Sequence, residues 1–142
     1  MILPPDMELF LTSYVRTVLA NLGQSVRVTN VEPSFTGSNP LALPLTKPIV
    51  VVRDDSGARG EILTFERSIG FTILAGSKAD MQAANDLARL TFGIVTDSAI
   101  IDAEGSPIAS IEDTNGPYAV ADDLDVARRY FTVDYMVVGS LS

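Results

Sequence analysis

Apolar residues recur at helical spacing near the start of this 142-residue chain and at strand spacing further along. Between Asp6 and Leu22 they follow the i, i+3, i+4 pattern of an amphipathic helix. Asp6 can cap or favourably charge the start of this helix, and Gly23 can end it. The apolar stripe is expected to pack into the protein's own core. Its members are Met7, Phe10, Leu11, Tyr14, Val15, Val18, Leu19 and Leu22.

Five later segments have the composition of β-strands. Pro48 to Asp54 contains a continuous apolar run, typical of a strand that is buried on both faces or lies at a subunit contact. Glu61 to Ala75 alternates apolar and polar residues, which predicts a long half-buried strand paired with the preceding one as a hairpin. Arg67 interrupts its apolar face beside Gly70, so a bulge or bend is expected there. The remaining strands are expected within Val26 to Val31, Ile108 to Ile111 and Tyr130 to Val138.

An alanine-rich stretch from Ala79 to Phe92 predicts a second helix, which Gly93 is expected to end. Ser77 and Asp80 resemble a capping box in which aspartate replaces glutamate. The order of helices and strands lacks regular βαβ alternation. We therefore expect the α+β class, with a mostly antiparallel sheet, two α-helices packed on one face, and a single domain over residues 1–142.

Two long segments carry no clear pattern of secondary structure, Glu32 to Lys47 and Glu112 to Val126. Loops of this length are uncommon in compact domains unless they bind something or stay disordered. The first contains three prolines and the three leucines Leu41, Leu43 and Leu45. It is interpreted either as an arm that inserts into a neighbouring subunit or as a cover over the chain's own core. Self-association is expected through this arm and through the edges of the sheet.

The composition excludes several kinds of chemistry. The chain has neither cysteine nor histidine, so it has no thiol nucleophile, no Ser-His pair and none of the commonest transition-metal ligands. Its 18 acidic and 10 basic residues give a net charge of −8, and such a surface repels phosphate backbones. No apolar run reaches the length that spans a bilayer. We expect no catalytic residues, no cofactor, no metal and no membrane contact.

The acidic clusters carry the oxygen ligands that a hard cation such as calcium prefers. Asp122, Asp123 and Asp125 lie close together but lack the spacing of a calcium-binding loop, so solvated loop acids are the preferred interpretation. Asp54 and Asp55 stand at a turn and are best explained by turn chemistry.

The order of these features resembles the tail terminator proteins of long-tailed bacteriophages. The features are the first helix, the short strand near Val28, the proline-rich loop, the run through Val52 to an aspartate–glycine turn, the long strand, the alanine-rich helix, the Gly116-Pro117-Tyr118 loop and the closing strand that ends near Gly139. The likeness covers nearly the whole chain and is one of layout.

The resemblance implies an architectural role. Subunits of this family form a ring, typically hexameric, that caps the head-proximal end of the tail tube, ends its polymerisation and provides the surface for head–tail joining. The implied partners are further copies of the chain, the tail tube protein and the head–tail connector protein, and DNA passes through without specific binding. The implied location is the virion, with assembly in the host cytoplasm.

On this interpretation the candidate residues at a subunit or partner interface are Leu41, Leu43, Leu45, Asp54 and Asp55, and Asp122, Asp123 and Asp125 are candidates for lining the lumen. Two alternatives stay open. One is another connector or tail tube component, such as a head completion protein. The other is a small enzyme that uses carboxylates.

Overall fold

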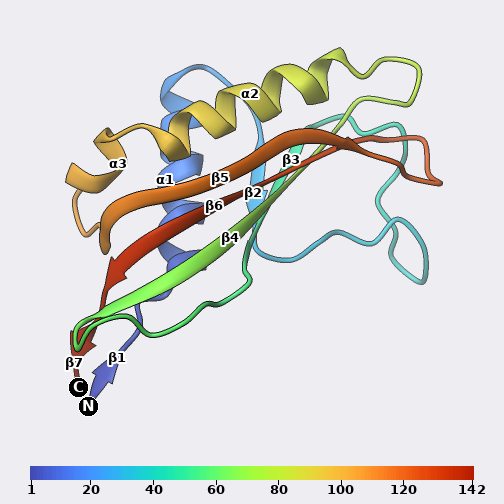
Figure 1. Cartoon of the computed structure of the whole chain (residues 1–142). Coiled ribbons are helices and arrows are strands. Elements are labelled where there is room, and N and C mark those ends of the chain that lie inside the picture. Colours follow the sequence, from blue (N-terminus) through green and yellow to red (C-terminus); the bar gives the residue numbers. More distant parts are fainter.

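A five-stranded sheet with two long helices on one of its faces forms the body of the computed structural model, which describes residues 1–142 (Figure 1). The strand order is β2-β3-β4-β6-β5, with every neighbouring pair antiparallel except β2 and β3. The strands are β2 Arg27–Thr29, β3 Ile49–Asp54, β4 Thr64–Ala75, β5 Ile108–Val120 and β6 Ala127–Val138. The predicted α+β class, with its mostly antiparallel sheet and its helices on one face, is confirmed.

The first helix, α1 (Met7–Asn21), begins and ends as predicted. The Asp6 side chain accepts a hydrogen bond from the Leu9 backbone amide at 3.0 Å, which satisfies one of the free amides of the first turn. At the other end Gly23 takes a φ of 76° and its amide donates to the Ala20 carbonyl. Glycine adopts this left-handed conformation without steric cost, so it ends the helix.

The second long helix, α2 (Gln82–Thr96), lies further along the chain than predicted. It starts after Asp80, whose amide donates a hydrogen bond to the Ser77 hydroxyl oxygen in a turn that precedes the helix. It also continues through Gly93, because Ile94 and Val95 are buried and their packing offsets the roughly 1 kcal/mol that glycine costs inside a helix. A short helix, α3 (Ala99–Asp102), follows.

The prediction that Glu112 to Val126 is irregular is wrong for most of this segment, because β5 extends from Ile108 to Val120. This strand lies at the edge of the sheet, and residues 112–116 are exposed. Its pairing with β6 contains three register irregularities. Polar residues are tolerated in such a strand because it needs only one hydrogen-bonded neighbour, so the sequence looks like a loop while the backbone is paired.

The bulge predicted near Arg67 and Gly70 is absent. β4 keeps an uninterrupted register with both β3 and β6 across this region. Gly70 has a different role: a Cβ atom there would lie 2.3 Å from the Tyr130 hydroxyl oxygen. Glycine therefore leaves the space in which the Tyr130 side chain crosses β4, and Arg67 packs over the Phe65 ring with 5.8 Å between guanidinium carbon and ring centroid.

The main core lies between the helices and the sheet. Alternate residues of β6 face it and are fully buried, as the sequence pattern predicts. Phe71 and Phe131 stack at its centre with ring centroids 4.7 Å apart. The sheet contributes Val50, Val52, Ile69, Phe71, Ile73, Phe131, Val133, Tyr135 and Val137. A smaller cluster of Ile49, Val51, Leu74 and Val126 lies on the other face.

The two ends of the chain meet beside one end of the sheet. β1 (Ile2–Leu3) pairs with β7 (Ser140–Leu141) as a separate two-stranded sheet, visible next to the N and C labels (Figure 1). None of the helices combines the length and the apolar character required to cross a membrane.

Replacing Tyr135 by Phe is expected to lower the free energy of unfolding by about 1.5 kcal/mol. The Tyr135 hydroxyl is buried and donates a 2.6 Å hydrogen bond to the Val95 carbonyl, which links β6 to α2. Urea titration measures the change. Tyr118, which is 44% exposed, supplies the matched control, and Tyr118→Phe should leave the midpoint unchanged. Equal midpoints for the two variants would contradict this role of the hydrogen bond.

Candidate functional site

The leucines of the proline–leucine arm (residues 39–48) lie against the sheet face opposite the helices. Leu41, Leu43 and Leu45 are partly buried on the small cluster formed by Ile49, Val51, Leu74 and Val126. The intervening residues Ala42, Pro44 and Thr46 are exposed. The arm therefore covers apolar residues of its own chain, which is the second of the two interpretations of the sequence. A contact between the arm and another subunit stays a prediction.

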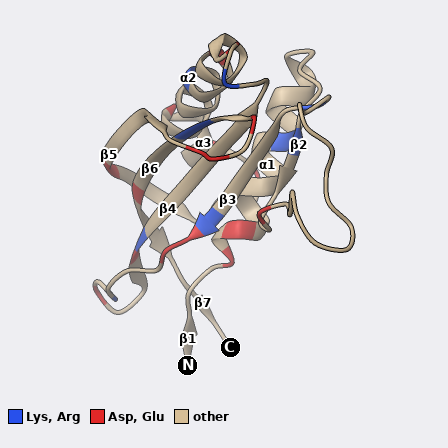
Figure 2. Cartoon of the chain, turned by 90° about the vertical axis from the view of Figure 1, so that its right-hand side faces the viewer, with Lys and Arg blue, Asp and Glu red and all other residues tan.

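Asp54 and Asp55 are tied into the hairpin between β3 and β4. Asp54 accepts a 2.7 Å hydrogen bond from the Ser56 amide, and Ser56 takes a φ of 65° in the turn. Asp55 pairs with Arg53 at 2.7 Å and lies 3.4 Å from the Tyr130 hydroxyl. In Figure 2 the end of β3 is basic and the turn that follows it is acidic.

These contacts shift the protonation equilibria of both partners of Asp55. The hydrogen bond from Arg53 to Asp55 raises the pKa of the Arg53 guanidinium further above its ordinary value. Burial raises the pKa of the Tyr130 hydroxyl, and the nearby Asp55 charge raises it further. The two aspartates thus organise the turn, as the sequence indicated, and Asp55 also connects the turn to β6.

The three acids proposed for a lumen differ in their surroundings. The Asp122 side chain is only 12% exposed and pairs with the Arg128 side chain at 2.9 Å. It also accepts a hydrogen bond from the Leu124 amide, and this bond, followed by the one from Arg128, holds the pKa of the carboxyl below its usual value. Asp125 accepts from the Lys78 amide at 3.1 Å, and Asp123 is exposed. Asp122 is therefore a structural ion-pair partner, while Asp123 and Asp125 remain at the surface.

Three carboxylates gather on the sheet face that the helices leave open. Glu66, Glu112 and Asp134 come from β4, β5 and β6 and line a cavity of about 240 Å³ together with Ser56, Gly57, Arg67, Ser68 and Tyr135. The sequence analysis missed this group because its members are about 20 to 70 residues apart in the chain. Strand pairing alone brings them together, and no local motif marks them.

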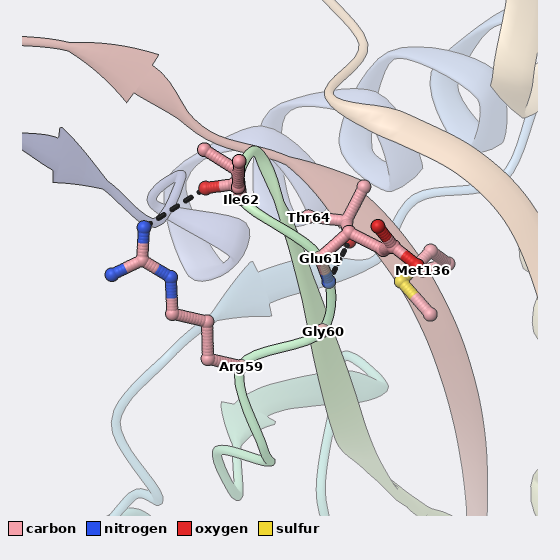
Figure 3. Close-up of a pocket in the computed structure, with 6 residues that line it drawn as sticks. All are labelled: Arg59, Gly60, Glu61, Ile62, Thr64 and Met136. Carbon is pink, nitrogen blue, oxygen red and sulfur yellow. Dashed lines mark hydrogen bonds between the residues drawn. The ribbon is translucent and has the colours of Figure 1, made fainter.

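A second, more open cavity of about 590 Å³ lies on the loop that precedes β4 (Figure 3). Two hydrogen bonds shape the loop: Arg59 donates to the Ile62 carbonyl at 2.9 Å, and the Glu61 amide donates to the Thr64 hydroxyl oxygen at 2.8 Å. Figure 3 shows Arg59 and Ile62 on one side of the loop and Thr64 and Met136 on the other. Gly60 completes the turn between them.

Neither cavity has both members of a hydrogen-bonded nucleophile and base among its lining residues, since the Ser110 hydroxyl that donates to Glu112 lies outside the lining of the first cavity. Ser56 and Ser68 line the first cavity, but neither hydroxyl donates to a carboxylate. No three acidic side chains converge closely enough to form a metal site.

Comparison with models of known protein families finds no matching family, and no curated protein matches the sequence.

Replacing Leu41 by Ser is expected to lower the free energy of unfolding by about 1–2 kcal/mol, because the side chain covers the small cluster and a hydroxyl cannot replace that apolar contact. Chemical denaturation of the isolated protein measures the loss. The neighbouring exposed residue gives the control, since Ala42→Ser should change stability by less than about 0.5 kcal/mol. A stable Leu41→Ser variant would mean that the arm does not support the fold.

Replacing Asp122 by Asn is expected to cost about 1.5 kcal/mol near neutral pH, because it removes the charge that Arg128 contacts. Since folding lowers the pKa of Asp122, its stabilising contribution is present above the ordinary value of 3.8 and is lost as the pH falls through the lower value of the folded state. The wild-type and variant curves of stability against pH should therefore converge below about pH 4. Asp123→Asn is the exposed control, and its stability should follow that of the wild type at every pH. A stability difference between wild type and Asp122→Asn that stays constant at all pH values would exclude the ion pair as the cause.

Proposed function

We propose that the protein is a structural subunit of a long-tailed phage, a tail terminator that forms a ring on the head-proximal end of the tail tube. In this role the ring ends tube polymerisation and provides the surface to which the head–tail connector binds. Its partners are further copies of itself, the tail tube protein and the connector protein. DNA passes through the bore without specific binding, and the protein resides in the virion after assembly in the host cytoplasm.

The observation that supports this proposal most is the one-sided construction of the sheet. Both long helices pack on one face, and beyond the small arm-covered cluster the other face carries polar side chains, among them Ser68, Thr72, Thr132 and Asp134. A ring subunit needs two unlike faces, because one faces the bore and the other faces outward. A polar sheet face suits the wall of a channel that stays filled with water.

Charge supports the same orientation. The net charge of the chain is −8, and Glu66, Glu112 and Asp134 gather on the open face. If this face lines the bore, its carboxylates repel the phosphates of DNA and keep counterion release from favouring adhesion. Asp123 and Asp125 stay candidates for the same wall, whereas the Asp122 carboxylate is occupied by Arg128.

The edges of the sheet are poorly suited to strand pairing between subunits, contrary to the expectation from sequence. β2 has three residues, and Arg16 occupies its Val28 carbonyl with a 2.9 Å hydrogen bond. β5 is interrupted by three register irregularities and contains Pro117, which has no amide to donate. Such features oppose the addition of a further strand. Subunits of the proposed ring therefore join through side chains.

Purified protein is expected to form closed rings, seen by negative-stain microscopy and as a single species of about six subunits in sedimentation velocity. Mixed with tail tubes, the rings should cap one end of each tube and stop further growth from it. Protein heated to denaturation before mixing is the control. A strictly monomeric protein that leaves tube ends bare would exclude the proposal, and growth of the protein into long tubes would identify it as a tube component instead.

A further inference from the structure

The loop from Arg59 to Leu63 displays apolar side chains on a rigid support. Ile62 is 77% exposed and Leu63 is 49% exposed. The Arg59–Ile62 and Glu61–Thr64 hydrogen bonds fix the loop, and the Arg59 guanidinium rests 5.4 Å from the centroid of the Phe65 ring. Large apolar side chains held in water by a fixed loop are costly for a monomer and are typical of a contact surface.

An apolar groove lies between α1 and α2 on a different part of the molecule. Its walls are Tyr14 and Val18 from α1 and Leu90, Gly93 and Ile94 from α2, and its volume is about 430 Å³. Gly93 keeps the groove open, since nothing lies within 4 Å of the position that a Cβ atom would take there.

The charges beside the groove complement those of the loop. Arg89 and Asp97 line the groove, are exposed and take part in no salt bridge within the chain. The loop carries Arg59 and Glu61, also without a salt bridge. The loop therefore carries one acid and one base, and the groove carries one base and one acid.

We propose that the loop Arg59–Leu63 of one copy inserts into the α1–α2 groove of the next copy, with Glu61 facing Arg89 and Arg59 facing Asp97. In Figure 1 the loop lies at the end of the sheet next to β7, whereas α2 lies over the face of the sheet that the helices cover. Such a contact joins unlike surfaces of identical subunits, so it repeats from copy to copy until the ring closes. This inference rests on the proposed ring and identifies its interface.

The test is a charge exchange read by sedimentation velocity. Ile62→Ser combined with Leu63→Ser, Glu61→Arg alone and Arg89→Glu alone should each raise the concentration needed for ring formation about tenfold or more. The double variant Glu61→Arg with Arg89→Glu restores an opposite-charge pair, so it should return that concentration to within about threefold of wild type. Circular dichroism and urea titration of each variant separate loss of assembly from loss of folding.

Two exposed residues outside both surfaces provide matched controls. Val31→Ser removes an apolar side chain that is 66% exposed, and Arg27→Glu reverses an exposed charge, and both should assemble as wild type does. If the wild type forms rings and every loop and groove variant forms them at the same concentration, the ring function stands and the proposed contact is overturned. Variants that form rings but no longer cap tubes would assign the loop to the tube subunit and also overturn it. Failure of the wild type to form rings would reject the proposed function itself.

Discussion

The antiparallel pairing of β4 with β6 is the interaction on which the rest of the structure depends. Twelve consecutive residue pairs, from Thr64–Val138 to Ala75–Ala127, join the two strands without a break. Because side chains alternate across this ladder, the same two strands present Phe71 and Phe131 to the helices and Thr72 and Tyr130 to the open face. A shift of one residue would exchange the two faces, so the buried aromatic pair fixes the register and with it the polar surface on the other side.

The sequence predicts the elements whose apolar residues face one continuous core. The helix after Asp6 and the strand through Phe131 are of this kind, since burial of a stripe or of every second residue leaves a period in the chain. The sequence does not predict the end of α2 or the length of β5, because the local signals there disagree with the tertiary structure. Gly93 is a local stop signal that buried Ile94 and Val95 override, and residues 112–116 are polar because an edge strand is solvated even though its backbone is paired.

The candidate surfaces likewise divide into those that the sequence indicates and those that only the folded structure brings together. The three arm leucines were recognised because apolar residues between prolines are unusual, but their burial against Ile49 and Leu74 depends on contacts distant in sequence. The carboxylate group of Glu66, Glu112 and Asp134 could not be predicted without the strand order. Ile62 and Leu63 fall within the range predicted as the long strand, but β4 begins at Thr64, so both lie exposed in the loop before it.

The open sheet face is mostly polar, whereas the loop Arg59–Leu63 exposes apolar side chains. If the open face lines a channel for DNA, as proposed, it stays polar and unoccupied and cannot also supply the apolar area that holds subunits together. Neither sheet edge offers an unbroken ladder to a further strand, because Arg16 occupies the Val28 carbonyl of β2 and register irregularities interrupt β5. In the proposed ring, the apolar contact area between subunits would then come from loops and from the outer surfaces of the helices. Ile62 and the groove beside Gly93 form one pair of an exposed apolar projection and a largely apolar recess.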